Sequence, residues 1–462
     1  MANRDNPLAC TDEPHREWQF PDRTRSVPRL SAVSHGVCVA AGEAARTAFL
    51  APSWGALPAH ARADLLHRLG DVLVAHTEEL ALLETRANGK PLTATRGEVG
   101  ALARWNRYFA AVAETMEDVS RPLSGTARAL ITLEPLGVVA ALTPFNGALS
   151  PGSWKLDPAL AAGNTVILKP PRAPASSVRL AELALEAGFP PGVIGVVIGG
   201  AVEGRRLGAR AAERMKQYVC EAGGKSAHIV FADGDLDAAI VAARQGAFSA
   251  AGQTCVAGSR ILVLSEVYEE LLRRYGEAVG RLRVGDPRDP RTHVGPVASA
   301  AALERIEGYV DDALAKGARA VTGGKRATVA APAEAGFWYE PTVLADATPD
   351  LAVCREEVFG PVVTVHPFDT EDEAVALANS VEYGLAAGFR PPRCGACAPG
   401  GATAGGGRGL GEHLPAAALE RAVRRLQTVR PGPGERRRGR RRVPPTKSVI
   451  TEHGTPAEPF GD

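Results

Sequence analysis

The sequence predicts an α/β fold with two domains built on parallel sheets, and three observations support this prediction. The chain has 462 residues, of which 45% are hydrophobic, so it is too long for one small core. Short apolar runs alternate with helical patterns over most of its length, as in strands joined by crossover helices. Glycine (50 residues) and proline (35) are frequent while aromatics make only 5%, which is typical of a Gly-rich α/β protein.

The first part of the chain predicts an arm followed by helices. Residues 1–37 show no clear periodicity and are rich in Arg, Pro and Asp, so we expect a weakly structured N-terminal arm. From Ala40 to Ala87 and from Thr95 to Met116, apolar residues recur at intervals of three and four. These stretches predict long helices that cover a sheet.

A first series of strands and helices runs from Gly137 to Val230. The apolar runs are G-V-V-A-A-L-T-P-F, N-T-V-I-L-K-P, V-I-G-V-V-I-G and A-H-I-V-F, with helical patterns near 175–188 and 203–216. Strands that alternate with helices predict a doubly wound parallel sheet, which binds ligands at the carboxyl ends of its strands.

A second series predicts a second α/β domain. Its elements are a helix at 235–251, a strand at 260–265, helices at 267–281 and 298–316, strands at 318–322 and 361–367, and a helix at 371–380. Residues 118–137 stand outside both series, because they alternate like an antiparallel hairpin. We expect this hairpin to form a small protruding arm.

The charge pattern separates one segment from the rest of the chain. Residues 391–445 hold 12 arginines, three glutamates, 8 prolines and 11 glycines but no aspartate, aromatic residue or isoleucine, a composition that predicts disorder. The run E-R-R-R-G-R-R-R at 435–442 is of a kind that binds nucleic acids. No folded recognition module surrounds it, so a solvated segment is the favoured interpretation and no nucleic-acid partner is predicted.

The cysteines and the apolar runs indicate the cellular compartment in which the protein is expected. The cysteines are odd in number and widely scattered, which favours a reducing compartment over a disulfide framework. They are Cys10, Cys38, Cys220, Cys255, Cys354, Cys394 and Cys397. The single C-x-x-C has no second ligand pair nearby, so no metal site is predicted. No signal peptide and no membrane-spanning run is present, so we expect a cytoplasmic protein without membrane contact.

One cysteine and one glutamate suggest chemistry. Cys255 lies among small residues in A-G-Q-T-C-V-A-G-S-R, where a substrate and backbone donors can approach a nucleophilic thiol. A small buried thiol is the alternative interpretation. Glu221 lies in C-E-A-G-G-K-S directly before a strand, and a carboxylate near a thiol can activate water. A surface carboxylate is the alternative for this residue.

Six motifs carry a resemblance to a known family. They are T-P-F-N at 143–146, W-K-L at 154–156, L-K-P at 168–170, E-x-G-G-K-S at 221–226, G-Q-T-C at 252–255 and E-E-V-F-G-P-V at 356–362. In this order and with these spacings they resemble the aldehyde dehydrogenase superfamily, from about Ala40 to about Gly388.

The resemblance implies the oxidation of an aldehyde to a carboxylic acid with NAD or NADP, through a cysteine thiohemiacetal and a thioester. Cys255 would attack the carbonyl carbon, and the Asn146 amide with the Cys255 N–H would receive the oxyanion. Glu221 would take a proton from water to release the acid, and Lys155 would occupy the family's proton-relay position. For Lys155, a solvated lysine is an equal alternative.

The resemblance also implies cofactor contacts. Lys169 would meet the adenosine-ribose hydroxyls, and Glu357 with Phe359 would hold the nicotinamide ribose. Gly199 and Gly204, which lie between an apolar strand and a helix, can present N–H groups to a pyrophosphate, with a plain turn as the alternative.

One position bears on the choice between the two cofactors. Arg172 stands near the position where the family usually has a ribose-binding carboxylate. An arginine there can pair with a 2′-phosphate, so NADP use is a hypothesis that a cofactor titration would test.

The family comparison implies the following domains: an NAD(P)-binding domain at 38–117 and 138–228, a catalytic domain at 229–390, and an oligomerisation arm at 118–137 and 446–452. It also implies a homodimer or homotetramer and a small aldehyde as the substrate.

Two departures from the family pattern leave alternatives open. The interval from Lys169 to Glu221 is shorter by about one helix and one strand, on the order of 20 residues. Residues 391–445 do not match, whereas T-K-S-V at 446–449 resumes the pattern, which suggests a reading-frame slip that re-reading the DNA would test. The alternatives to an active enzyme are a catalytically impaired relative, a coenzyme-A-acylating relative, and a module that binds through the arginine tract.

Overall fold

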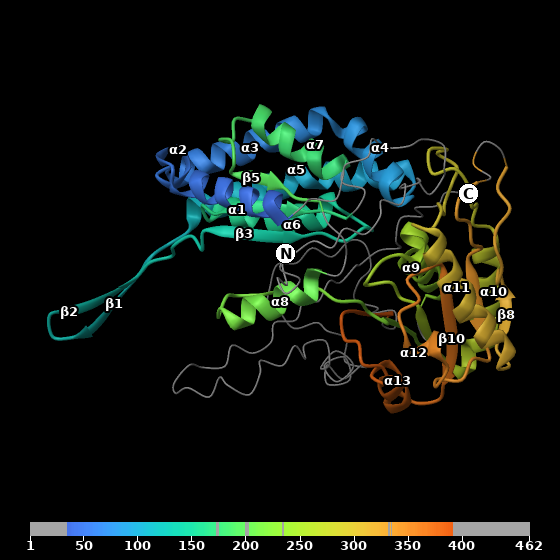
Figure 1. The fold of residues 1–462 in the computed structure, drawn as a ribbon. Helices are drawn as coiled ribbons and strands as arrows, with labels where there is room; N and C mark the ends of the chain where they lie inside the picture. The colour runs from blue at the N-terminus through green and yellow to red at the C-terminus, as the bar shows by residue number, and fades with distance from the viewer. Residues whose placement is uncertain are drawn as a thin grey trace, which may run out of the picture. The chain divides into compact units, whose positions relative to one another are not determined.

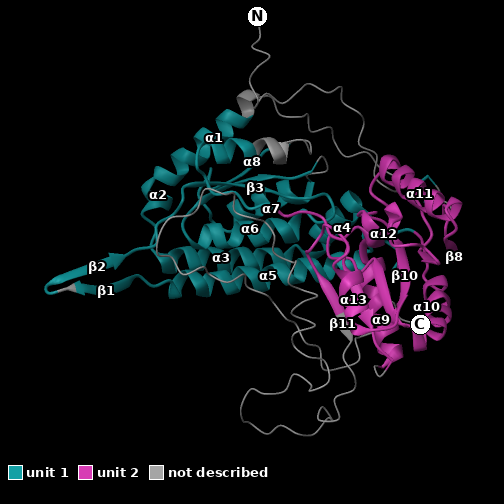
Figure 2. Ribbon diagram, turned by 90° about the horizontal axis from the view of Figure 1, so that it is seen from below, with its two compact units in different colours: residues 1–220, 286–290, 331–336 teal, residues 221–285, 291–330, 337–462 magenta. Residues whose placement is uncertain are grey.

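The structure is a computed structural model, and it describes residues 35–171, 175–198, 203–232, 235–330, 333 and 335–390. These residues form two compact units (Figures 1 and 2). The first comprises 1–220, 286–290 and 331–336, and the second comprises 221–285, 291–330 and 337–462. Each unit contains parallel strands and helices, so the predicted α/β fold is confirmed. The predicted segments 391–445 and 446–452 lie outside the described residues, as does most of the N-terminal arm.

The first unit contains a three-stranded parallel sheet and a hairpin. Its helices are α1 (His35–Leu50), α2 (Pro52–Gly55), α3 (Ala59–Ala75), α4 (Thr77–Asn88), α5 (Leu92–Thr115), α6 (Leu149–Ala161), α7 (Ala175–Glu186) and α8 (Glu203–Glu213). Its strands are β1 (Val119–Ser124), β2 (Ala127–Ile131), β3 (Val138–Leu142), β4 (Thr165–Lys169) and β5 (Ile194–Val196). The parallel sheet has the order β3-β4-β5.

Helices cover both faces of this sheet. Helix α1 packs against all three strands, and Figure 2 places it on the opposite side from α6 and α7. The apolar stripe of α3, which includes Leu66 and Leu69, is fully buried against α5, α6 and α7. Val166 on the central strand β4 is also fully buried, so the core of this unit lies between the sheet and these helices.

Strands β1 and β2 form the predicted antiparallel hairpin, with Gly125 in its turn at a φ of 54°. Figure 1 shows the hairpin extending away from the helices of the first unit. Its side chains are mostly exposed, including Leu123 and Leu130, each 68% exposed, and Ile131 at 48%. A two-stranded hairpin of this kind is only marginally stable by itself in water.

The second unit contains a six-stranded sheet. Its helices are α9 (Leu236–Phe248), the 3-10 turn η1 (Ser249–Gly252), α10 (Ser265–Gly280), α11 (Ala300–Ala315), α12 (Ala352–Arg355) and α13 (Glu371–Ala378). Its strands are β6 (Ala227–Val230), β7 (Arg260–Leu264), β8 (Arg319–Thr322), β9 (Thr342–Ala345), β10 (Val362–Phe368) and β11 (Ala387–Arg390). The order is β11-β6-β7-β10-β9-β8, and only β8 pairs antiparallel.

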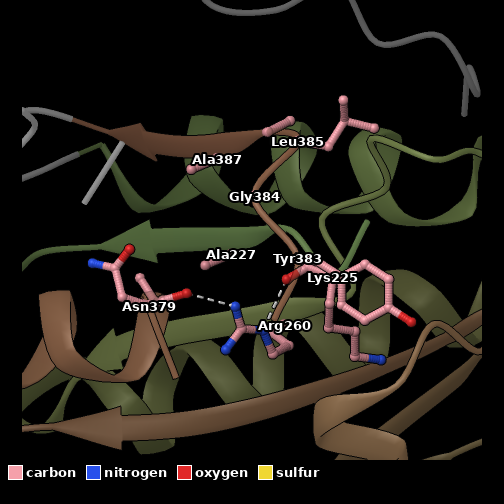
Figure 3. Close-up of a pocket in the computed structure, with 10 residues that line it drawn as sticks. Lys225, Ala227, Arg260, Asn379, Tyr383, Gly384, Leu385 and Ala387 are labelled. Atoms are coloured by element: carbon pink, nitrogen blue, oxygen red, sulfur yellow. Dashed lines mark hydrogen bonds between the residues drawn. The ribbon is translucent and has the colours of Figure 1, made fainter. Parts of the chain in front are cut away.

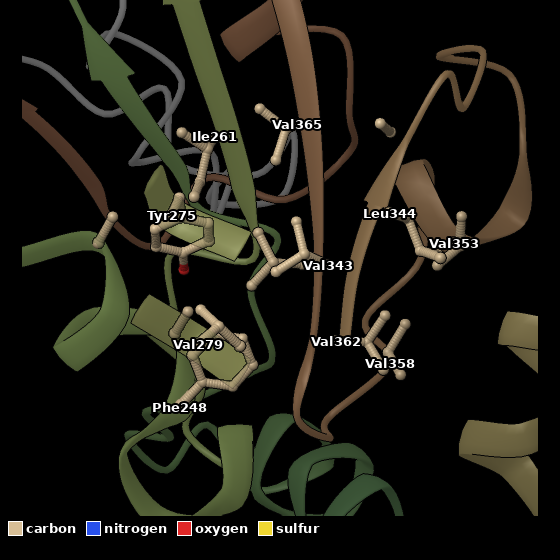
Figure 4. Packing of buried hydrophobic residues seen from close by; sticks show 14 of the residues in the cluster. Phe248, Ile261, Tyr275, Val279, Val343, Leu344, Val353, Val358, Val362 and Val365 are labelled. Atoms are coloured by element: carbon tan, nitrogen blue, oxygen red, sulfur yellow. The ribbon is translucent and has the colours of Figure 1, made fainter. Parts of the chain in front are cut away.

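The second sheet is buried on both faces. Along β7, Ile261 and Val263 point into a large cluster that includes Tyr275 of α10 and Phe248 of α9 (Figure 4). The alternate residue Leu262 belongs to a smaller cluster with residues of α13. Because successive side chains of a strand point to opposite faces, a strand covered on both sides is almost continuously apolar, as the run I-L-V-L shows.

A buried arginine joins the sheet to α13. Arg260 is 4% exposed and its guanidinium donates to three carbonyl oxygens, those of Lys225 (3.0 Å), Leu377 (2.8 Å) and Ala378 (2.8 Å). These bonds satisfy a charged group that would otherwise be costly to bury. They fix the start of β6, where the E-x-G-G-K-S motif ends.

Some boundaries differ from the sequence-based expectation. The division between the units falls between residues 220 and 221, whereas we expected it at 228, because β6 pairs with β7 and β11 of the second sheet. Strands β9 and β11 were not predicted, since runs of four residues carry too little periodicity. Within the described ranges, no helix is both long and apolar enough to cross a membrane.

Candidate active site

Cys255 follows a strained turn in the second unit. Ala250, Ala251 and Gly252 after α9 have φ values of 53°, 55° and 69°, in the left-handed region that costs a non-glycine residue free energy. The turn is held by the buried Gln253 side chain, which accepts a hydrogen bond from the Ala298 N–H (2.9 Å). Cys255 itself is half-buried, so its thiol has a fixed place and is still partly accessible.

Two glycines of the E-x-G-G-K-S motif pack directly against the catalytic loops. A Cβ on Gly224 would collide with the backbone carbonyl oxygen of Cys255, and one on Gly223 would collide with the Glu357 carboxyl group. The Gly224 N–H donates to Glu357 Oε1 at 3.0 Å. The motif therefore brings the cysteine loop and the E-E-V-F-G loop into contact with one strand end.

The charges around the thiol favour its protonated form. Burial raises the pKa of Cys255 above its ordinary value, and the negative charges of Glu357 and, more weakly, Glu221 raise it further. The N–H groups of Cys255 and Val256 act in the opposite direction. Glu221 is exposed and lies three residues before Gly224, which packs against the Cys255 carbonyl, so the predicted nucleophile and the predicted base belong to neighbouring loops of the second unit.

The loop with Glu357 and Phe359 is supported from helix α11. Arg305 of α11 donates to the Val358 carbonyl oxygen (3.1 Å), and Phe359 has a left-handed φ of 52°. Burial raises the pKa of Glu357, while the Gly224 N–H, Arg305 and Lys225 oppose the shift. Glu357 is thus a half-buried carboxyl group held in one place, as a ribose-binding residue would need.

Lys225 was not selected from the sequence. It is 2% exposed, and burial lowers its pKa to about 7, with Arg260 acting in the same direction and Cys354 and Glu357 opposing it. It lines a cavity of about 20 Å³ together with Arg260, Tyr383 and residues of the 384–387 segment (Figure 3). The sequence shows that the motif contains Lys225, but only the structure shows that this side chain is buried.

The remaining predicted residues lie in the first unit. Asn146 is half-buried in the turn between β3 and α6, and Lys169 ends β4. The Thr143 N–H donates to the Lys169 carbonyl oxygen (3.1 Å), which joins the two strand ends at one edge of the sheet. Lys155 lies on α6 and its Nζ donates to the Pro151 carbonyl oxygen at 3.4 Å.

Some predictions are not tested by these positions. Arg172 and Gly199 lie outside the described residues, whereas Gly204 lies in the first turn of α8, and its contact with a pyrophosphate stays a prediction. Because Asn146 and Lys169 belong to one unit and Cys255 to the other, their meeting in one active site stays a prediction. In the described part of the chain, no three His, Cys, Asp or Glu side chains cluster as metal ligands.

The family match and the relatives found by comparison all belong to one family. Residues 21–390 match the model of the aldehyde dehydrogenase family. The chain is 38% identical to a betaine aldehyde dehydrogenase of Cereibacter sphaeroides over 80% of each chain. It is also 38% identical to the mitochondrial succinate-semialdehyde dehydrogenase of Arabidopsis thaliana, over 72% of this chain and 67% of the relative.

Solved structures agree with the family match. The NAD⁺ complex of an aldehyde dehydrogenase from Bacillus cereus is similar with a TM-score of 0.77 at 34% identity, covering 81% of this chain and 80% of that one. An NAD-dependent aldehyde dehydrogenase from Sinorhizobium meliloti has a TM-score of 0.75 at 35% identity and 84% coverage of both chains. The family match ends at Arg390, where the Arg/Gly/Pro-rich segment begins.

The packing of Gly224 yields a first prediction. Gly224→Ala should displace the cysteine loop, lower the free energy of unfolding by roughly 1–3 kcal/mol and change the alkylation rate of Cys255. Gly246→Ala on α9 is the matched control, because nothing lies within 4 Å of its Cβ and alanine favours a helix. Urea denaturation and mass-spectrometric alkylation measure both effects. Parent-like results for Gly224→Ala would contradict the close contact.

The electrostatics yield a second prediction, for the cofactor-free protein. Glu357→Gln removes the stronger of the two carboxylate charges that raise the Cys255 pKa, so alkylation should reach its half-maximal rate at a lower pH. The neighbouring Glu356 accepts a hydrogen bond from Tyr309 and is not among the charges that shift the thiol. Glu356→Gln should therefore leave the pH profile unchanged, and an equal shift in both variants would refute the assignment.

Proposed function

The chain belongs to the aldehyde dehydrogenase family, and on this premise we propose which of its residues carry out each step of the reaction. It is an NAD(P)-dependent aldehyde dehydrogenase, an oxidoreductase that oxidises an aldehyde with NAD or NADP. The observation that supports the residue assignment best is the half-buried Cys255 after a strained turn, against which Gly224 of the glutamate motif packs while its N–H bonds to Glu357.

In the first step the Cys255 sulfur forms a bond to the aldehyde carbon, and the carbonyl oxygen becomes an oxyanion. The Cys255 N–H and the Asn146 side-chain amide are the proposed donors to this oxygen. A donor placed in advance at such an oxyanion is typically worth about 10²–10³ in rate. Asn146 lies half-buried in the turn that joins β3 to α6, and an amide at the end of a strand of this sheet supports the assignment.

A bound NAD(P)⁺ would supply the hydride acceptor for this reaction, and loss of hydride from the thiohemiacetal carbon would leave a thioester on Cys255. The residues present have the chemistry to hold such a cofactor. Glu357 offers a half-buried carboxyl group to ribose hydroxyls, and Lys169 offers an ammonium group at the end of β4. Phe359 next to Glu357, Gly199 and Gly204 before and in α8, and Arg172 after β4 complete the proposed binding set.

The thioester is then hydrolysed, and Glu221 is the proposed base. An exposed carboxylate can take a proton from water as the water attacks the acyl carbon, and Glu221 is exposed in the loop that packs against Cys255. The products are a carboxylic acid and the restored thiol, with Lys155 as the proposed proton relay. This base separates the proposal from a coenzyme-A-acylating enzyme, in which an incoming thiol would release the acyl group.

One observation favours a second candidate, a catalytically impaired relative. Within the described residues the first unit has a parallel sheet of only three strands, and β3 forms one of its edges. Val138 on this strand is 39% exposed. An apolar strand at an open edge is costly, and it fits the shortened interval between Lys169 and Glu221.

We further propose a homodimer or homotetramer in the cytoplasm. The exposed leucines of the β1–β2 hairpin would be covered by another copy of the chain, which supplies the packing that a lone hairpin lacks. The odd number and wide scatter of the cysteines support a reducing compartment for this proposal.

Pre-steady-state kinetics test the assignment of Cys255 and Glu221. Glu221→Gln should keep a burst of NAD(P)H of about one per active subunit and lose about 10²–10⁴ in steady-state rate, because only deacylation needs the base. Cys255→Ala should lose both the burst and the steady state. Glu269→Gln, an exposed carboxylate on α10, is the control and should behave as the parent. Turnover by Cys255→Ala at the parent rate would overturn the proposal.

Sedimentation tests the role of the hairpin. Replacing Leu123 and Leu130 together by aspartate should convert the oligomer into monomers, because charges in an apolar interface are costly to desolvate. Leu185→Asp on α7, at a leucine 52% exposed in the same unit, is the control that should keep the parent mass. An unchanged mass in the double variant would show that the hairpin is not the interface.

A further inference from the structure

Three residues connect α4 to α5, and their backbone has little freedom. Gly89 ends α4 with a left-handed φ of 81°, and its N–H donates to the Thr85 carbonyl oxygen (2.9 Å). The Lys90 N–H donates to the Asn88 side-chain oxygen (3.0 Å), and the ring of Pro91 restricts φ directly before α5. The connection therefore fixes the backbone from which the Lys90 side chain extends.

The ammonium end of Lys90 is held as well. Its Nζ donates to both carboxylate oxygens of Glu98 on α5, at 2.7 and 2.9 Å. The side chains of Lys90 and Glu98 are only 11% and 32% exposed. Charge-assisted hydrogen bonds that are partly shielded from water are stronger than those of an ion pair in open solvent. The Lys90 side chain is thus fixed at its backbone and at its charged end.

The fixed ammonium lies beside the turn that contains Asn146. Gly147, the next residue, is buried, and a Cβ built on it would lie 3.5 Å from the Lys90 Nζ. The other two nearest atoms belong to Pro151 of α6, at 3.3 and 3.7 Å. Of these neighbours, only Lys90 comes from outside the helix that the turn leads into. Distances of this size mean that the ammonium occupies the space next to the Gly147 backbone.

We propose that Lys90 is a positioning residue, which keeps the Asn146 turn in place because Glu98 holds its ammonium beside that turn. The inference rests on the proposed role of Asn146 as a donor to the oxyanion. Lys90 acts through the turn, without a bond to the substrate or the cofactor. The Asn146 amide must be placed accurately, because a misplacement of about 1 Å can cost about 10² in rate.

Hydrogen exchange on the full-length chain tests the packing without relying on activity. Lys90→Met keeps a side chain of similar length but loses both bonds to Glu98. The amides of residues 145–148 should then exchange about fivefold faster or more, because the turn loses a fixed neighbour. The later turns of α6 should keep their rates, which shows that the unit remains folded. Parent-like exchange at 145–148 would overturn the proposal.

A second ion pair on the same helix provides a matched control. Arg96 of α5 pairs with Glu78 of α4 at 2.8–3.0 Å, but the two side chains are 43% and 70% exposed. An exposed pair of this kind contributes little. Arg96→Met also removes one positive charge, two residues from Glu98, and should leave the exchange at 145–148 as in the parent. Equal acceleration in Arg96→Met and Lys90→Met would overturn the assignment to Lys90.

A kinetic cycle tests whether Lys90 acts through Asn146. Lys90→Met should lower the rate of the NAD(P)H burst about tenfold in the parent and have no further effect in Asn146→Ala, because coupled residues are not additive. A parent-like burst in Lys90→Met, or fully additive effects, would overturn this inference alone. A parent-like Asn146→Ala would refute the proposed oxyanion role itself, and the inference with it.

Glu98→Gln keeps the inference testable if Lys90→Met does not fold. The amide has nearly the same size but carries no charge and accepts through only one oxygen, so it holds the Lys90 ammonium less firmly. Exchange at 145–148 should rise about threefold, and the burst rate should fall about threefold. Glu78→Gln, the same change in the exposed pair, should match the parent in both measurements. Parent-like values for Glu98→Gln would overturn the role of Glu98 in holding Lys90.

Discussion

The close packing of glycine against peptide backbone is the constraint on which the catalytic half of the site depends. Gly224 lies against the carbonyl of Cys255, and its N–H bonds to Glu357. Gly252, in turn, lies against the carbonyl of Gly360. Three loops that are far apart in the sequence therefore touch through backbone atoms, with no side chain to act as a spacer. The position of the thiol is set by this contact more than by any bond that the thiol makes.

The same packing disfavours the reactive thiolate form of Cys255. Burial and the charge of Glu357 hold the pKa of Cys255 above its ordinary value, whereas attack on a carbonyl needs the thiolate. The cationic ring of NAD(P)⁺, when bound near Glu357, would offset that charge and favour the thiolate. Lys225 lies behind the carboxyl group and partly offsets it already. The Cys255 thiol is therefore mainly protonated in the free protein, and a cationic nicotinamide ring near Glu357 would lower its pKa.

The family motifs assigned Cys255, Glu221 and Glu357 to one predicted site. The structure shows that the loops carrying these motifs pack against one another, while the roles of the residues stay predictions. The apolar runs predicted all three strands of the first parallel sheet and most strands of the second, but not the buried β9. What escaped prediction is the support behind the motifs. The sequence does not show whether the Lys225 ammonium is buried or solvated. The Arg305 guanidinium contacts the Val358 carbonyl, in a loop that is distant in the sequence. Such contacts follow from tertiary packing, which no local pattern encodes.

The division into two units separates the chemistry into parts with different structural demands. Cys255, Glu221 and their supporting loops belong to the second unit, whose six-stranded sheet is covered on both faces. The shortened segment affects only the first unit, where β3 is an edge of a three-stranded sheet. A defect there would affect the proposed cofactor contacts and the turn of Asn146, whereas the packing of Gly224 against Cys255 lies within the second unit. Thiol reactivity and hydride transfer are therefore separable properties of this chain, and a loss of the second does not imply a loss of the first.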